Sequence, residues 1–366
     1  MSSSSCVRFL VINGDVIQTQ VPQVSTFLET NPGAYTTTRT HNAASCILFW
    51  DRHMRRIAQS ATILANSRPE FFFGLSKSCP FNSFFASSSS WESVMRPLVS
   101  DALRKVMTIS MNKRGGGEEL AITSLVSGNV SNLDSIVEGD TEETRISKAI
   151  NVCVHVGTYV PLVFGVKENG ARLAVVGHGR EVARAKFSEW VTMRKSLEKL
   201  RPPLTNELLL SNDGDQILEG CLTNFFAVCC KEKTDVTEQY LSDSKSGYSF
   251  EVQTAPLSDG VLPGVIRQLV IEVCQSRGIP FREVAPCWSQ RKLWNEAFIT
   301  NSLRVVQHVE KIQVPSSWEL IEMKTWKEVN WEEICFKECP GVITSEIQKE
   351  IGRRADLEGY PISNFT

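Results

Sequence analysis

Residues 218–226 have the sequence Leu-Glu-Gly-Cys-Leu-Thr-Asn-Phe-Phe, which places Glu219 in an apolar turn just before an apolar segment that runs to Cys230. Such a segment is typical of a buried strand, and we expect one over residues 225–230. A carboxylate in these surroundings needs a cationic or hydrogen-bonding partner to stay ionised. A protonated pyridine nitrogen would be a suitable partner.

Two further segments are candidates for binding an anion. Residues 262–267, Leu-Pro-Gly-Val-Ile-Arg, lead into an apolar pattern that predicts a helix over residues 265–277. Free backbone N–H groups and the dipole at such a helix start favour a phosphate, although proline and glycine also precede helices that bind nothing. Arg56, in a second predicted helix over residues 53–64, could make a charged contact to a phosphate.

The composition is that of a globular protein and argues against several classes of function. The chain has 366 residues, with 39 Lys+Arg against 41 Asp+Glu, a net charge of -2 and 42% hydrophobic residues. A charge this close to neutral does not suit a nucleic-acid or anionic-membrane surface. No apolar run approaches the ~20 residues that a membrane span needs. We therefore expect neither nucleic acid nor a membrane as a partner.

The eleven cysteines and five histidines show no spacing typical of a metal site. The cysteines are scattered apart from Cys229-Cys230, no Cys-x-x-Cys occurs, and Cys153 with His155 would supply only two ligands. We therefore expect no metal. Scattered cysteines indicate a reducing compartment, and the serine-rich start is too short and too poor in arginine for a transit peptide, so we expect a cytosolic protein.

The order of predicted elements indicates an α+β protein with two lobes. A strand over residues 9–12 leads into an Asn13-Gly14 hairpin turn, and helices alternate with antiparallel strands after it. Residues 161–177, with three glycines, are interpreted as the connection between the lobes. The other expected elements are strands over residues 35–40, 47–50, 120–126, 152–156, 207–210 and 297–300, and helices over residues 91–106 and 182–200.

We therefore expect an N-terminal lobe over residues 1–169, a C-terminal lobe over residues 170–314 and a C-terminal extension over residues 315–366. The polar, acidic tract over residues 127–147 is interpreted as an insertion or hairpin tip between two strands. The extension is rich in Trp, Glu and Lys, which suggests a surface segment with its own short helices.

Three segments in register resemble those of the class IV aminotransferases. They are His53-x-x-Arg56, Glu219-Gly-x-x-x-Asn224-x-Phe226 and Leu262-Pro263-Gly264. This family contains pyridoxal-phosphate enzymes of fold type IV, among them branched-chain and D-amino-acid aminotransferases and 4-amino-4-deoxychorismate lyase. The resemblance runs from about Phe9 to Val309. It implies a two-lobed fold type IV enzyme, similar to D-amino-acid aminotransferase, that is a homodimer with the cofactor in the cleft between its lobes.

The resemblance also implies a role for individual residues. Arg56, the backbone amides of Val265 and Ile266, and the hydroxyl of Ser302 would bind the phosphate of pyridoxal 5'-phosphate. Glu219 would accept a hydrogen bond from the protonated pyridine nitrogen. That contact would keep the ring cationic, and a cationic ring is the electron sink that makes the Cα–H bond of an amino-acid substrate acidic.

The lysine that bonds covalently to the cofactor has no rigid motif around it. A helix, a strand and their turns should separate it from Glu219, which amounts to about thirty residues. Lys186 precedes Glu219 by 33 positions, Lys195 by 24 and Lys199 by 20. Lys186 also stands at the head of the predicted helix over residues 182–200, whereas the other two fit its solvated face. We therefore favour Lys186 as the catalytic lysine.

The branch of the family is open at this stage. The stretch Gly-Ala-Tyr-Thr-Thr-Thr-Arg at residues 33–39 is similar to a strand of the lyase branch, and Tyr35 and Arg39 are candidates for binding substrate; packing and a surface ion pair would explain them equally well. An aminotransferase that acts on an amino acid and a 2-oxo acid is the first hypothesis. A lyase that releases pyruvate is the second, and a non-catalytic binding protein on the same fold is the third.

Overall fold

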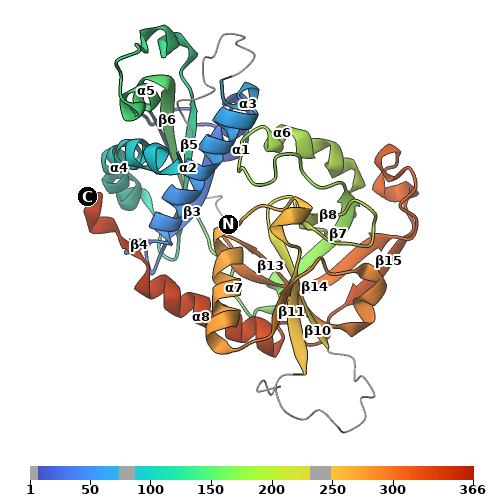
Figure 1. The fold of residues 1–366 in the computed structure, drawn as a ribbon. Helices are drawn as coiled ribbons and strands as arrows, with labels where there is room; N and C mark the ends of the chain where they lie inside the picture. Colours follow the sequence, from blue (N-terminus) through green and yellow to red (C-terminus); the bar gives the residue numbers. More distant parts are fainter. Residues whose placement is uncertain (1–6, 74–86, 231–248) are drawn as a thin grey trace, which may run out of the picture. The chain divides into compact units, whose positions relative to one another are not determined.

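A computed structural model describes residues 7–73, 87–230 and 249–366 (Figure 1). The chain divides into two compact units. Unit 1 contains Met1–Pro161, Arg184–Lys195 and Arg354–Thr366, and unit 2 contains Leu162–Ala183 and Ser196–Arg353. Both helices and strands are present in each unit, so the α+β fold class is confirmed.

Unit 1 is built on a seven-stranded sheet with the strand order β16-β4-β3-β5-β6-β1-β2. All of its pairings are antiparallel, as the sequence predicts. The strands are β1 Arg8–Ile12, β2 Asp15–Ile17, β3 Ala34–His41, β4 Cys46–Ile47, β5 Glu119–Gly128, β6 Ile150–Tyr159 and β16 Tyr360–Pro361.

The first hairpin forms where the sequence predicts it. Ile12 pairs with Asp15, which leaves Asn13 and Gly14 as a two-residue turn. Both turn residues have positive φ, 48° and 92°, the backbone that suits the twist of a tight hairpin.

The helices predicted over residues 53–64 and 91–106 are longer in the structure, and one predicted strand is shorter. The helices are α1 Val24–Thr30, α2 Trp50–Ser67, α3 Glu70–Phe73, α4 Ser88–Lys113, α5 Glu142–Ala149 and α6 Trp190–Met193. The strand predicted over residues 47–50 is wrong beyond Ile47. Phe49 takes a left-handed conformation with φ 47°, and α2 begins at the next residue. The tract over residues 127–147 contains a 3-10 turn and most of α5, between β5 and β6.

Unit 2 is built on a nine-stranded mixed sheet with the strand order β12-β11-β10-β13-β14-β7-β8-β9, and β15 pairs with β14. Its strands are β7 Ala171–Gly177, β8 Glu207–Leu210, β9 Glu219–Gly220, β10 Asn224–Cys230, β11 Phe250–Thr254, β12 Phe281–Glu283, β13 Trp294–Asn301, β14 Val305–Pro315 and β15 Trp331–Cys335. The helices are α7 Val265–Arg277 and α8 Val342–Leu357, and residues 342–353 of α8 belong to unit 2.

The interpretation of residues 161–177 as a connection is wrong over its second half. Ala171–Gly177 forms β7, which pairs in parallel with both β8 and β14. Leu173, Ala174, Val175 and Val176 are fully buried. A strand covered on both faces has a continuous apolar run instead of an alternating pattern. The glycines around this run favour a connection, and for that reason the sequence analysis does not predict the strand.

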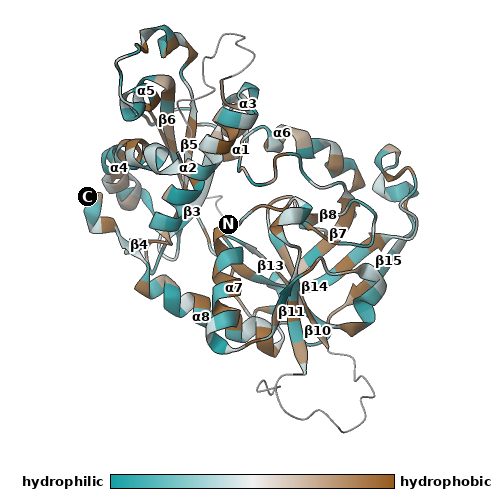
Figure 2. Cartoon of the chain, viewed as in Figure 1, coloured by the Kyte–Doolittle hydropathy of each residue, from teal (hydrophilic) through white to brown (hydrophobic). Residues whose placement is uncertain are grey.

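Residues of the predicted C-terminal extension take part in unit 2. β15 pairs with β14 from Lys311↔Cys335 to Pro315↔Trp331. In α8, Ile343, Ile347 and Ile351 recur every four residues and are buried. Figure 2 shows hydrophobic and hydrophilic residues alternating along this helix, as expected for one buried face. Among the described residues, no helix is long and apolar enough to cross a membrane.

Candidate active site

Glu219 is a buried carboxylate that unit 2 surrounds with donors. It lies on β9 with 1% of its surface exposed. Its Oε1 accepts hydrogen bonds from Arg180 Nε at 2.9 Å and Nη2 at 2.6 Å. Its Oε2 accepts from the backbone N of Leu262 at 3.0 Å and from Asn224 Nδ2 at 3.2 Å. These four donors, two of them from the Arg180 guanidinium, satisfy this carboxylate as an anion at a position that excludes water.

Arg180 is a buried partner of Glu219 that the sequence analysis does not identify. Its side chain is 4% exposed and pairs with Glu219, 39 positions later in the chain. It follows β7, between the segment interpreted as a connection and the helix predicted over residues 182–200. Sequence offers no signal for such a pair, because a buried arginine and a surface arginine look the same until the strands that carry their partners are placed.

Asn224 links Glu219 to the start of α7. Besides Glu219, its Nδ2 donates to the carbonyl oxygen of Leu262 at 2.9 Å. A Cβ added at Gly264 would lie 2.1 Å from Asn224 Oδ1, so glycine is needed for this close approach. Asn224 also pairs with Thr300 across β10 and β13. The Glu219 turn, the start of α7 and the end of β13 are therefore neighbours in one part of unit 2.

The start of α7 has the donors that an anion needs. Gly264 caps the helix without a side-chain hydrogen bond, and the first helical backbone bond runs from Gln268 N to Gly264 O at 3.0 Å. Val265 and Ile266, at the first two helical positions, are buried. Their N–H groups precede that bond and, like the dipole of this 13-residue helix, favour an anion.

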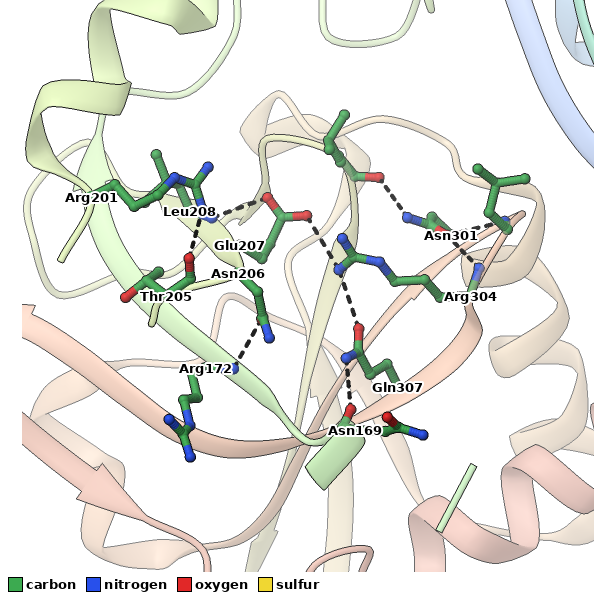
Figure 3. A network of polar contacts seen from close by, with 12 residues as sticks. Asn169, Arg172, Arg201, Thr205, Asn206, Glu207, Leu208, Asn301, Arg304 and Gln307 are labelled. Atoms are coloured by element: carbon green, nitrogen blue, oxygen red, sulfur yellow. Dashed lines mark hydrogen bonds and ion pairs between the residues drawn. The ribbon is translucent and has the colours of Figure 1, made fainter. Parts of the chain in front are cut away.

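Ser302 lies in a tight loop between β13 and β14. Asn301 Oδ1 accepts from the backbone N of Leu303 at 3.1 Å and of Arg304 at 2.8 Å, which closes the loop. Figure 3 shows Arg304 reaching from this loop to Glu207, at 3.9 Å, and to Gln307 Oε1, at 3.2 Å. These contacts fix the loop, and Ser302 is 9% exposed within it.

Arg56 is a buried cation of unit 1. It lies on α2 with 6% of its surface exposed, and its Nη2 donates to Thr36 Oγ1 at 2.6 Å. Its Nε has no hydrogen-bond partner, and no carboxylate lies within ion-pair distance of it in the described parts of the chain. Burial lowers the pKa of Arg56 to about 10. A guanidinium without a counter-charge suits a phosphate.

Lys186 lies in an extended segment of unit 1, so the helix predicted over residues 182–200 is wrong at its start. Phe187 forms a β-bridge with Ala34, and α6 begins only at Trp190. The Lys186 carbonyl accepts from Tyr35 N at 3.0 Å, and its own N–H donates to Ser60 Oγ at 3.0 Å. The burial of Ala183, Ala185 and Phe187 alternates with period two, and that spacing was the signal for an extended segment.

The three candidate lysines differ in their surroundings. Lys186 is half-buried, with Nζ 4.6 Å from the centroid of the Tyr35 ring. Lys195 is 58% exposed at its side chain and pairs with Glu29 at 2.8 Å. Lys199 is exposed and donates to the Glu322 carbonyl.

Tyr35 and Arg39, the candidate substrate residues, are both buried in unit 1. Tyr35 packs in a core cluster that includes Phe27, Leu125 and Val191. Arg39 is 8% exposed and its Nη1 donates to the Thr40 carbonyl at 2.9 Å. Burial lowers the pKa of Arg39. Its low exposure argues against a surface ion pair.

The candidate residues therefore divide between the units. Arg56, Lys186, Tyr35 and Arg39 belong to unit 1, and Glu219, Val265, Ile266 and Ser302 belong to unit 2. Within the described residues, no group of three or more His, Cys, Asp or Glu side chains could hold a metal ion.

Comparison with known proteins identifies the fold and finds a family match for one part of the chain. The family model of the class IV amino-transferases matches residues 170–312. A branched-chain aminotransferase from Thermoproteus uzoniensis, solved with norvaline, is 17% identical, with a TM-score of 0.58 over 97% of this chain and 99% of that one. The Escherichia coli branched-chain aminotransferase is 16% identical, with a TM-score of 0.55 over 95% of this chain and 94% of that one.

A third structure, a hypothetical aminotransferase from Mycobacterium tuberculosis in its PLP-bound form, is 13% identical, with a TM-score of 0.56 over 94% of this chain and 99% of that one. A comparison with curated proteins finds no sequence relative of this chain. The chain thus has the two-lobed α+β fold of these aminotransferases, and its residues 170–312 match the model of the class IV amino-transferases.

Proposed function

We propose that this protein is a pyridoxal-phosphate-dependent aminotransferase that transfers an amino group between an amino acid and a 2-oxo acid. The observation that carries the proposal is the buried Glu219 carboxylate, held as an anion by Arg180 within the segment that matches the family. Burying a carboxylate in its charged form is energetically unfavourable. A cationic ring that binds beside Glu219 would give this buried charge a function.

The residues present fit the cofactor. Arg56 is a buried cation without a carboxylate partner in the described residues, and the start of α7 offers backbone N–H donors. Each of these two features suits a phosphate. Because the Mycobacterium tuberculosis relative binds PLP, the same cofactor is proposed here.

The cofactor, when bound, supplies an electron sink that makes the substrate Cα–H bond acidic. Lys186 Nζ would be the amine that bonds to the cofactor, and as a free amine it would move a proton between the substrate Cα and the cofactor C4′. Glu219 holds the ring nitrogen in its protonated state. A ring N–H would be a fifth donor to this carboxylate, so one of the four present contacts would have to lengthen.

A lyase that releases pyruvate from aminodeoxychorismate is the second candidate. The stretch over residues 33–39 favours it, because it is similar to the corresponding strand of the lyase branch. The two reactions share their first proton transfer. Turnover that requires an added 2-oxo acid identifies the aminotransferase, and pyruvate release without one identifies the lyase.

The lysine assignment is tested by covalent labelling. Purified protein incubated with pyridoxal phosphate should turn yellow, and borohydride should then fix the cofactor to the peptide that contains Lys186. Lys186→Ala should lose both the label and turnover, whereas Lys195→Ala should keep them, because Lys195 is an exposed residue. A protein that stays colourless would refute the enzyme proposal and leave a non-catalytic binding protein. Label at Lys195 or Lys199 would refute only the choice of Lys186.

Three broader proposals accompany this function. The protein is proposed to act as a homodimer in the cytosol. Its functional division is proposed to be an N-terminal lobe over residues 1–169, a cofactor-binding lobe over residues 170–314 and an extension over residues 315–366. Light scattering of the purified protein with cofactor measures the assembly.

A further inference from the structure

We propose that Thr36 is a positioning residue that orients Arg56 toward a phosphate and leaves the charge of the guanidinium unneutralised. This inference rests on the proposed function, since it assigns Arg56 to the cofactor phosphate. It concerns three side chains of unit 1: Thr36 on β3, and His53 and Arg56 one turn apart on α2.

The three side chains form a closed set of hydrogen bonds. Arg56 Nη2 donates to Thr36 Oγ1 at 2.6 Å, and Thr36 Oγ1 lies 2.8 Å from His53 Nδ1. Arg56 Nη2 is also 3.3 Å from His53 Nδ1. All three residues are at least nine-tenths buried, with exposed fractions of 1%, 0% and 6% for Thr36, His53 and Arg56. Water therefore cannot replace these contacts.

The direction of each hydrogen bond follows from the chemistry of the groups. A guanidinium only donates, so Thr36 Oγ1 must accept from Arg56. Arg56 Nη2 also faces His53 Nδ1 and can only donate to it, so we infer that Nδ1 carries a lone pair and accepts the hydroxyl proton of Thr36 as well. His53 is thus neutral with its proton on Nε2. Burial and the nearby charge of Arg56 both lower the pKa of His53 well below its ordinary value, which agrees with a neutral ring.

This set of partners leaves the positive charge of Arg56 available. Two other buried arginines are paired with carboxylates: Arg180 with Glu219, and Arg267 with Glu283 at 2.6 Å. Arg56 instead contacts a neutral hydroxyl and a neutral imidazole, and its Nε has no partner in the described part of the chain. Neutral acceptors fix the direction of the guanidinium without cancelling its attraction for an anion.

The neighbouring threonine provides a matched control. Thr37 is also on β3, but successive side chains of a strand point to opposite faces. Its Oγ1 lies 3.0 Å from Thr123 Oγ1 on β5. Thr37→Val therefore removes a hydroxyl from the same strand without touching Arg56.

The experiment measures binding of pyridoxal phosphate and of pyridoxal, which lacks the phosphate, to cofactor-free protein by absorbance. Thr36→Val should weaken binding of pyridoxal phosphate about tenfold, as for loss of a hydrogen bond to a charged group, and leave pyridoxal binding unchanged. Thr36→Ser keeps the hydroxyl and should bind both as the wild type does. Thr37→Val should also match the wild type.

Nitrogen-15 NMR of the imidazole rings gives a second measurement that needs no folded Thr36 variant. His53 is assigned by the signal that His53→Gln removes. The wild type should show an unprotonated Nδ1 and a protonated Nε2 at this residue. A protonated Nδ1 would overturn the proposal. If Thr36→Val folds, that preference for one tautomer should weaken in it.

The outcomes separate this inference from the proposed function. If the wild type binds pyridoxal phosphate no more tightly than pyridoxal, the phosphate role of Arg56 fails and the proposed cofactor site fails with it. If the wild type prefers pyridoxal phosphate and Arg56→Gln loses the preference, the site stands. In that case, a Thr36→Val variant that keeps the full preference, or that weakens both ligands equally, overturns the positioning role of Thr36.

Discussion

Glu219 and Arg56 are both buried charges, but the chain treats them differently. Glu219 receives a guanidinium and two further donors from unit 2, whereas Arg56 receives only neutral acceptors from unit 1. A buried charge without partners is unfavourable in a folded protein. The satisfied anion is therefore stable by itself, and the cation depends on a ligand for its full stabilisation.

Gly264 is the residue whose substitution should damage the Glu219 site most directly. In Gly264→Ala, the new Cβ would lie 2.1 Å from Asn224 Oδ1 and would push the amide away from Leu262 O and Glu219 Oε2. We expect the free energy of unfolding to fall by about 1–3 kcal/mol, with weaker cofactor binding. Urea denaturation and a cofactor titration measure the two effects.

Gly352 is the matched control for that substitution. It lies within α8, and a Cβ added there would meet nothing within 4 Å. Gly352→Ala should therefore raise the free energy of unfolding by about 0.5–1 kcal/mol, because alanine favours a helix over glycine. Equal losses of stability in the two variants would contradict the close approach of Gly264 to Asn224.

At the scale of elements, α2 serves as a common support for two functional groups. His53, Arg56 and Ser60 recur at i, i+3 and i+7, so they share one face of the helix. Arg56 is the proposed phosphate ligand, and Ser60 Oγ accepts from the backbone N–H of Lys186. One helix face thus fixes the cation and the segment that carries the lysine.

Ser60→Ala should loosen the lysine segment. The substitution leaves the backbone N–H of Lys186 without its acceptor, and we expect a loss of about 1–3 kcal/mol in the free energy of unfolding. Hydrogen exchange at the Lys186 amide should become faster. Ser110→Ala is the control, because the buried Ser110 hydroxyl donates to Val106 O within α4. Its removal leaves no N–H group without an acceptor. An unchanged exchange rate at the Lys186 amide in Ser60→Ala would refute the role of the Ser60 hydroxyl in holding this segment.

Local patterns predicted the elements whose signals are local. The Asn13-Gly14 turn, α7 and the strand after Glu219 depend on turn residues and periodicity, and all three form as expected. The segment at Lys186 and strand β7 were misjudged, because long-range pairing decides their structure. Arg180 and Thr36 were missed for the same reason, since their partners lie 39 and 20 positions away. The sequence analysis therefore predicts the charged residues Glu219 and Arg56 but not the side chains that bind them.

At the scale of the whole molecule, buried histidines should make the protein sensitive to acid. Burial is the largest cause of a lowered pKa at the buried His53, His155 and His308, and at the half-buried His41. Below a pH of about 6.5, which is the pKa of a histidine in the unfolded chain, these side chains bind protons in the unfolded state but not in the folded state. The free energy of unfolding should therefore fall as the pH is lowered from 7 to 5, by up to about 1.4 kcal/mol per pH unit for each histidine.

Denaturation in urea at pH 7, 6 and 5 measures this dependence. His308→Gln should reduce the slope, because it removes one buried imidazole from the titration. A stability that stays constant from pH 7 to pH 5 would contradict the lowered pKa values.

The uncompensated charge of Arg56 also bears on the lifetime of the protein in a cell. A ligand that binds only the folded state stabilises it, and chains that unfold more often are degraded sooner. Without a phosphate beside Arg56, newly made chains would be the less stable population and the first to reach a protease. We expect the abundance of this protein to follow the cell's supply of the vitamin from which pyridoxal phosphate is made, even at a constant rate of synthesis.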